Sequence, residues 1–268
     1  MSAGAARAAS ATLLAVAALA LASCGGEGAD VERAGELTVA AASDLRPAFE
    51  ELGRRFEARE GIAVTFSFGS SGQLAQQIRN GAPFDLFASA DVGFVDEVIA
   101  AGRGRAETKE TYAFGRIVVW SRERRLRRGP RDAAEVRTLA IANPRHAPYG
   151  VAAEQALASA GVLGAVRDRL VLGENVSDTL RLAQSGNADA AIVALSLALA
   201  APEGQWTLVD ADAHEPLEQA LVVTARGEAG ERARRFARFV GSAEGRDVMR
   251  RAGLPLPGER LELGPGDG

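Results

Sequence analysis

Four short segments of the chain combine small or hydroxyl-bearing residues with a predicted helix start: residues 40–44 (AAASD), 69–72 (GSSG), 146–150 (HAPYG) and 175–177 (NVS). The first turn of a helix has N–H groups that lack an acceptor within the helix, and it carries the positive end of the helix dipole. Serine adds a hydroxyl donor, and glycine lets the backbone approach a ligand closely. Together the four segments predict an anion site built without any formal positive charge.

The elements that must position these segments alternate between short apolar strands and amphipathic helices, beginning at residue 36. The helix expected over 44–60 has the clearest period. Its apolar stripe consists of Leu45, Phe49, Leu52 and Phe56. This alternation predicts an α/β fold with largely parallel sheets. Ligands of open α/β sheets bind outside the carboxyl ends of the strands, which is where the four segments lie.

The length of the chain, 268 residues, together with this rhythm predicts two lobes. We expect lobe 1 to comprise residues 36–113 and about 221–258, and lobe 2 to comprise residues 114–220. Residues 259–268 are expected to form a disordered tail. Further strands are predicted at 63–68, 85–88, 117–120, 138–142, 190–195, 206–209 and 220–223, and further helices at 72–80, from 91, and at 150–160, 177–184, 231–240 and 243–251.

The N-terminal 23 residues have the features of an export signal. Arg7 precedes an apolar stretch over 12–21 that is too short to span a bilayer comfortably. The stretch ends in LASC, which resembles the lipoprotein cleavage box of bacteria, and Cys24 is the single cysteine of the chain. An ordinary signal peptide with an incidental cysteine is the alternative. We predict lipid attachment at Cys24, a flexible tether over 24–35, and a folded part that faces the periplasm or the cell exterior.

Composition excludes several classes of protein. The hydrophobic share of 47%, the charged share of 25% and the net charge of −4 are ordinary for a globular protein. Five arginines between 122 and 128 form one basic run. The run contains no aromatic residue, so we interpret it as a solvated loop and predict no nucleic-acid partner.

An enzymatic function is not favoured by the sequence. His146 and His214 are its only imidazoles, and GSSG lacks the spacing of a nucleophile elbow. We expect His146 to be structural or at the rim of a cleft, and His214 to face solvent. The spacing of histidines and carboxylates suggests no metal site. We therefore predict no catalytic residue, no cofactor and no direct ligand of a metal cation.

Five segments bear on the family of the chain, namely residues 40–43 (AAAS), 68–71 (FGSS), 81–91 (GAPFDLFASAD), 143–150 (NPRHAPYG) and 190–196 (AAIVALS). Taken together and in this order, the five segments resemble the periplasmic molybdate-binding protein family of ABC importers. The resemblance extends over about residues 36–258. It implies a two-lobed periplasmic binding protein fold, type II-like, with the ligand cleft between the lobes. It also implies a monomer that delivers molybdate or tungstate to a membrane permease. The sequence does not separate these two ligands, and it does not identify the permease or the membrane that holds the anchor.

Carried over to this chain, the resemblance places hydroxyl donors at Ser43 and Ser71 and backbone N–H donors at Tyr149 and Val176. Ser70 is the neighbour that could share the role of Ser71. Some family members add a tyrosine hydroxyl at the position of Ala194 in this chain. The missing donor is then replaced by Ser196 or by a hydroxyl elsewhere.

Asp44, next to Ser43, has two interpretations. As the N-cap of the following helix, its carboxylate would accept backbone N–H bonds and point away from the ligand, which is the interpretation we favour. As an acceptor inside the site, it would suit a protonated anion such as hydrogen phosphate. This second interpretation would make phosphate the ligand. Sulfate, a deprotonated tetrahedral oxyanion like molybdate, is a further alternative ligand, and a surface lipoprotein that only scaffolds a complex is a distant alternative function.

Overall fold

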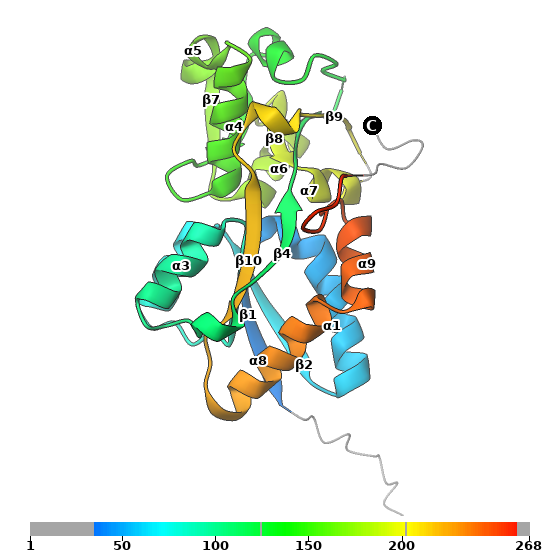
Figure 1. Ribbon diagram of the computed structural model, residues 1–268. Coiled ribbons are helices and arrows are strands. Elements are labelled where there is room, and N and C mark those ends of the chain that lie inside the picture. The colour runs from blue at the N-terminus through cyan, green and yellow to red at the C-terminus, as the bar shows by residue number, and fades with distance from the viewer. Residues whose placement is uncertain (1–34, 124, 202, 262–268) are drawn as a thin grey trace, which may run out of the picture. The chain divides into compact units, whose positions relative to one another are not determined.

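The computed structural model describes residues 35–123, 125–201 and 203–261. Cys24, the predicted signal peptide, nearly all of the predicted tether and residues 262–268 lie outside the described residues. In the part of the chain that is described, no helix has the length and apolar character needed to cross a membrane. Two five-stranded sheets form the framework (Figure 1).

The first sheet has the strand order β2-β1-β3-β10-β4. Its strands are β1 (Glu36–Ala42), β2 (Ala63–Gly69), β3 (Leu86–Ser89), β4 (Glu110–Gly115) and β10 (Leu217–Val223). Strand β1 is parallel to β2 and β3, whereas β10 is antiparallel to β3 and β4. The parallel strands bring the segments that follow β1 and β2 to the same edge of the sheet.

Helices cover both faces of this first sheet. One group comprises α1 (Arg46–Glu60), α8 (Gly227–Val240) and α9 (Ala243–Arg251). The other group comprises α2 (Ser71–Arg79) and α3 (Val92–Ala100), which bury a separate cluster of apolar side chains against the sheet. In α1 the predicted stripe is realised, since Phe49, Leu52 and Phe56 are buried.

The second sheet repeats this plan with the order β7-β6-β8-β5-β9. Its strands are β5 (Ile117–Ser121), β6 (Leu139–Ala142), β7 (Leu170–Gly173), β8 (Ala190–Ala194) and β9 (Gln205–Leu208). Strand β6 is parallel to β7 and β8, and β5 is antiparallel to β8 and β9. The accompanying helices are α4 (Pro148–Ser159), α5 (Leu163–Val166), α6 (Val176–Gln184) and α7 (Leu195–Ala200). The predicted two-lobed α/β fold is thereby confirmed.

The chain passes twice between the sheets. It leaves the first sheet at the end of β4 and enters β5 after one residue, Arg116, and it returns between β9 and β10. The C-terminal segment lies beside the outward crossing, because the N–H of Phe114 donates to the carbonyl of Pro255 at 2.8 Å. Of the predicted tail, Glu259 pairs with Arg250, and Leu261 packs against the core.

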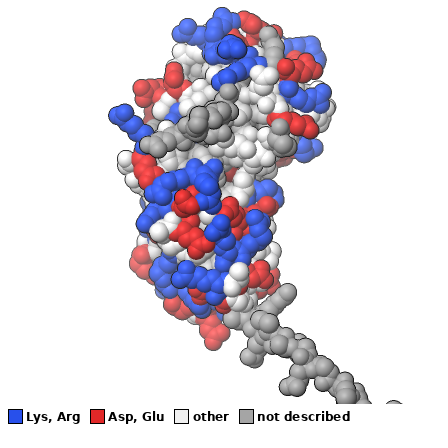
Figure 2. All heavy atoms as spheres, turned by 90° about the vertical axis from the view of Figure 1, so that its right-hand side faces the viewer, with Lys and Arg blue, Asp and Glu red and all other residues white. Residues whose placement is uncertain are grey.

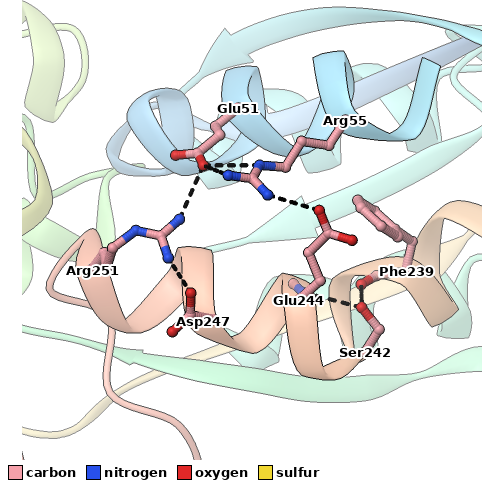
Figure 3. A network of polar contacts seen from close by, with 8 residues as sticks. Glu51, Arg55, Phe239, Ser242, Glu244, Asp247 and Arg251 are labelled. Atoms are coloured by element: carbon pink, nitrogen blue, oxygen red, sulfur yellow. Dashed lines mark hydrogen bonds and ion pairs between the residues drawn. The ribbon is translucent and has the colours of Figure 1, made fainter. Parts of the chain in front are cut away.

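Ion pairs join α1 to α9 (Figure 3). Glu51 accepts from Arg55 at 2.7 Å and from Arg251 at 3.0 Å, and Arg55 also donates to Glu244 at 2.8 Å. On the face that includes α9, basic and acidic side chains are interspersed (Figure 2). The side chains of this network are between about a third and a half exposed, so each pair contributes at most about 1 kcal/mol to stability.

Candidate functional site

The four segments singled out in the sequence surround one small cavity. Two of them follow β1 and β2 of the first sheet, and the other two follow β6 and β7 of the second. The cavity has a volume of about 10 Å³, far below the roughly 300–1,000 Å³ of sites for organic ligands. Its polar lining residues include Ser43, Asp44, Ser70, Ser71, Tyr149 and Asn175, and Val176 completes the edge. In this closed structure the cavity therefore leaves no room for an organic ligand of ordinary size.

Ser43 and Ser71 have hydroxyl protons available for a ligand. The Oγ of Ser71 accepts the backbone N–H of Ala90 at 3.0 Å, and the Oγ of Ser43 accepts that of Ser177 at 3.3 Å. Because a hydroxyl both accepts and donates, the acceptor role of each serine is filled from the backbone and its proton can turn to the cavity. Both serines are buried.

Tyr149 and Val176 lie in the first turns of α4 and α6. Backbone N–H groups at these positions have no acceptor within the helix. Asn175 caps α6 by accepting from the N–H of Asp178 at 3.0 Å, which leaves the N–H of Val176 unused by the cap. The four residues predicted to bind the ligand are thus brought together around one cavity, and their contact with a ligand stays a prediction.

Ser70 also lines the cavity, but its proton is used elsewhere. Its hydroxyl donates to the carbonyl of His146, whose Nδ1 lies 3.0 Å from the same Oγ. The N–H of Gly72 donates to that carbonyl as well, at 3.0 Å. These bonds tie the start of α2, beside the first sheet, to the segment that precedes α4, beside the second. Ser70 and His146 therefore hold the lobes together across the cavity.

The interpretation of Asp44 as the N-cap of α1 is wrong. The chain enters α1 through a 3₁₀ turn over Ser43–Leu45, so the N-cap position falls on Leu45 and no side chain caps the helix. This places the Asp44 side chain inside the protein, with an exposed fraction of 0%. Its Oδ2 accepts from the Tyr149 hydroxyl at 3.0 Å and from Nε2 of Gln219 at 2.6 Å.

Burial raises the pKa of Asp44 to about 6, and the hydrogen bonds from Gln219 and Tyr149 act in the opposite direction. The second carboxyl oxygen, Oδ1, is buried and has no hydrogen-bond partner among the described residues. Asp44 is therefore a buried carboxyl between the lobes, at the wall of the cavity.

Sequence reasoning missed Gln219 and Tyr112. The Tyr112 hydroxyl lies 3.2 Å from Oε1 of Gln219, which orients the amide so that its Nε2 faces Asp44. The signal available in the sequence is a glutamine directly before the apolar run Ala220–Val223 of β10. A tight contact supports the arrangement, because a Cβ on Gly115 would lie 2.5 Å from the Tyr149 hydroxyl.

Ser196 does not line the cavity. Its hydroxyl donates to the backbone carbonyl of Asp44 at 2.8 Å, and Ala194 ends β8 as a buried residue paired with Ile117. Neither residue supplies a donor to the cavity in this structure. In the described residues, no group of three or more histidines, cysteines or carboxylates could hold a metal ion.

The expectation that His214 faces solvent is wrong, since only 8% of the residue is exposed. Its Nδ1 donates to the carbonyl of Glu215 at 2.7 Å, and burial lowers the pKa of the imidazole. The loop is held against α4 because the N–H of Glu215 donates to the side chain of Gln155 at 3.0 Å. This contact between the loop and α4 accounts for the burial of His214.

Comparison with known proteins assigns the family. Residues 37–254 match the family described as bacterial extracellular solute-binding protein. The chain belongs to this family. It is 32% identical over 222 residues to the molybdate-binding protein ModA of Rhodobacter capsulatus, covering 82% of this chain and 88% of that one.

Two further relatives extend the comparison. The solved structure of the Azotobacter vinelandii periplasmic molybdate-binding protein is 32% identical, with a TM-score of 0.78 over 82% of this chain and 99% of that one. A putative ABC transporter substrate-binding lipoprotein of Bacillus subtilis, YvgL, is 28% identical over 84% of this chain and 88% of its own. The resemblance of this solute-binding protein to molybdate-binding proteins is confirmed.

Proposed function

We propose that this solute-binding protein captures molybdate or tungstate outside the cytoplasm and delivers it to an ABC import permease. The observation that carries the proposal is a small cavity ringed by neutral donors from both lobes. Serine hydroxyls and helix N-terminal N–H groups suit a tetrahedral oxyanion that has lost all its protons. The molybdate-binding relatives support this choice of ligand. We further propose that the protein acts as a monomer and has no catalytic activity.

The proposed motion is a closure of two lobes on the ligand. Residues 36–113 and about 221–258 would move as one body against residues 114–220. The crossings after β4 and before β10 supply the flexible connections for such a hinge. The hydrogen bonds between Ser70 and His146 and between Tyr149 and Asp44 support closure as the state that encloses the ligand.

Hydrogen phosphate is the second candidate ligand, and Asp44 is the observation that favours it. An ionised carboxyl at the wall of the cavity could accept the proton that hydrogen phosphate carries and molybdate lacks. Hydrogen phosphate would donate its proton in a hydrogen bond to Asp44, whereas molybdate has no proton to donate.

Calorimetric titration of the purified protein with molybdate, tungstate, sulfate and phosphate tests these assignments. Neutral donors cannot separate dianions by charge, but a ring spaced for longer metal–oxygen bonds leaves sulfate with stretched hydrogen bonds. We expect sulfate to bind at least about a hundredfold more weakly than molybdate, which corresponds to about 2.7 kcal/mol. Equal affinities for sulfate and molybdate would contradict the assignment, and a preference for phosphate would favour the second candidate.

Replacing either donor serine tests the position of the site. A hydrogen bond to a charged group contributes about 1.5–3 kcal/mol, so Ser43→Ala and Ser71→Ala should each weaken molybdate binding about ten- to a hundredfold. Ser185→Ala is the matched control, because this exposed serine lies at the far end of α6. If both site variants bind as the wild type does, the site has been placed wrongly.

We propose that Cys24 carries a lipid that anchors the protein to a membrane. The LASC box supports this, and a relative is itself a putative lipoprotein. Cys24→Ser should remain unprocessed or appear in the soluble fraction, because the thiol that accepts the lipid is absent. Cell fractionation with immunoblotting measures the outcome. A variant that is processed and sediments with membranes as the wild type does would contradict the anchor.

A further inference from the structure

Asp44 is a buried carboxyl that the proposed binding of a dianion leaves unexplained. Its Oδ2 receives two donors, from Tyr149 on α4 and from Gln219 on β10. Its Oδ1 is equally buried and receives none among the described residues. The residue follows the donor Ser43 directly and lines the same cavity. One oxygen of the carboxyl is thus satisfied and the other is not.

The surroundings of Asp44 hold no compensating positive charge. The titratable groups that face it are the hydroxyls of Tyr149 from α4 and Tyr112 from β4, and burial raises the pKa of both well above the usual value, so both are neutral. Gln219 from β10 and Ser196 from α7 are uncharged. No arginine, lysine or histidine of the described residues contributes to the pKa of Asp44.

An ionised Asp44 would therefore oppose the ligand. A buried carboxylate without a cation is unfavourable by itself, and a dianion in the adjacent cavity adds repulsion in a medium that screens it poorly. A proton on the carboxyl removes both effects. Oδ2 already accepts two hydrogen bonds, so the position left for the proton is Oδ1.

We propose that Asp44 holds a proton in the loaded, closed protein, so that capture of a dianion is coupled to the uptake of one proton. The proton comes from solvent and forms an O–H bond at Oδ1, and it returns to solvent when the lobes open. No other covalent bond changes. The charge of Asp44 and dianion together falls from −3 to −2. This inference rests on the proposed function, and it makes Asp44 the residue that sets the pH dependence of binding.

The raised pKa of Asp44, about 6 in the closed structure without ligand, is consistent with this role. A neighbouring dianion raises the pKa of the carboxyl further, because it disfavours a second negative charge. Above the pKa of Asp44 in the ligand-free protein, each unit of pH then weakens binding by up to about tenfold, because the proton taken up on binding becomes tenfold less concentrated in the solvent.

Calorimetry at pH 8 with molybdate, in buffers of different ionisation enthalpy, counts the protons taken up. We expect about one proton per molybdate in the wild-type protein and none in Asp44→Asn, whose amide is uncharged at every pH. Between pH 7 and 9 the wild-type Kd should rise about tenfold per unit, whereas the variant's Kd should stay flat. At pH 8 the variant should bind at least about tenfold more tightly than the wild type.

Gln219→Leu provides a second test with a readout that a purely structural role would not move. This change removes one hydrogen bond that lowers the pKa of Asp44. Molybdate binding by the variant should therefore begin to weaken at a higher pH than binding by the wild type. A structural defect alone would weaken binding equally at all pH values.

Several results would overturn the inference. Tight molybdate binding with no proton uptake and no pH dependence in the wild type contradicts it, even if neither variant folds. Uptake that persists in Asp44→Asn places the proton elsewhere and also contradicts it. An absence of molybdate binding at every pH would instead overturn the proposed function, so the two failures are distinguishable.

Discussion

Gly72→Ala should weaken molybdate binding about 5- to 150-fold while leaving the ligand-free protein folded. In the closed structure, a Cβ at this position would lie 2.7 Å from the carbonyl oxygen of His146 and 3.0 Å from the ring of Phe94. The carbonyl oxygen belongs to the backbone of the other lobe and cannot rotate away, whereas Phe94 lies on α3 in the same lobe as Gly72 and the end of its ring can shift. Overpacking against the carbonyl costs about 1–3 kcal/mol, and the closed state alone bears this cost.

In the open state the His146 carbonyl is not in contact with this position, so the cost of overpacking is absent. The backbone of Gly72 also does not require glycine. Its φ is not positive, and it lies in the first turn of α2, where alanine is a good helix former. Small-angle scattering should show the wild type becoming more compact with molybdate and the variant remaining unchanged. Gly164→Ala is the control, since a Cβ there meets no atom within 4 Å. Binding within twofold of wild type in Gly72→Ala would show that the lobes do not close through this contact.

The sequence predicted the regular elements best where apolar periodicity was strong. The strand expected at 63–68 is β2 (Ala63–Gly69), and the helix expected at 72–80 is α2 (Ser71–Arg79). Both elements are bounded by glycine, serine or asparagine, which mark turns and caps. Such signals are local, so they can be read without knowledge of the fold.

Elements were missed where the local signal was ambiguous. Strand β4 (Glu110–Gly115) begins with polar residues, and β7 (Leu170–Gly173) is an edge strand whose first three residues are not fully buried. Strand β8 and helix α7 form one apolar run, because Ala194 and Leu195 are consecutive. Hydrophobicity alone cannot divide such a run into strand and helix. Strand β10 starts three residues before the predicted position, because Gln219 is buried with its amide bonded rather than exposed.

In the candidate site, too, some residues could be predicted from local sequence and others could not. The serines and helix starts at the cavity were predicted because each is recognisable from its own neighbours in the chain. The orientation of Asp44 was not, since its partners Tyr149 and Gln219 lie 105 and 175 residues further along. A carboxyl two residues before a helix that has a proline in its first turn has the composition of a cap. Its actual role depends on which distant donors the two lobes bring to it.

Asp44→Asn should stabilise the ligand-free protein increasingly as the pH rises, to the extent that its lobes stay closed and keep Asp44 buried as in this structure. The pKa of Asp44 is raised in the folded protein, from 3.8 to about 6, because burial disfavours the charged form. A carboxyl of this kind gives its full stability below the unfolded pKa, and that stability is lost as the pH rises through the folded pKa. The loss amounts to about 2 kcal/mol between pH 4 and pH 7. Asparagine has nearly the same shape and no charge, so it does not lose this stability.

Chemical unfolding of the ligand-free wild type and variant at several pH values between 4 and 7.5 measures the effect. We expect the difference in free energy of unfolding, variant minus wild type, to grow by about 2 kcal/mol from pH 4 to pH 7.5, whatever its value at pH 4. Comparing the change with pH, and not the offset, removes the contribution of the altered hydrogen bonds. Asp212→Asn, at an exposed position, should change stability by less than about 0.5 kcal/mol throughout. If the difference in free energy of unfolding between the wild type and Asp44→Asn stays constant or shrinks with rising pH, burial does not disfavour the ionised form of Asp44.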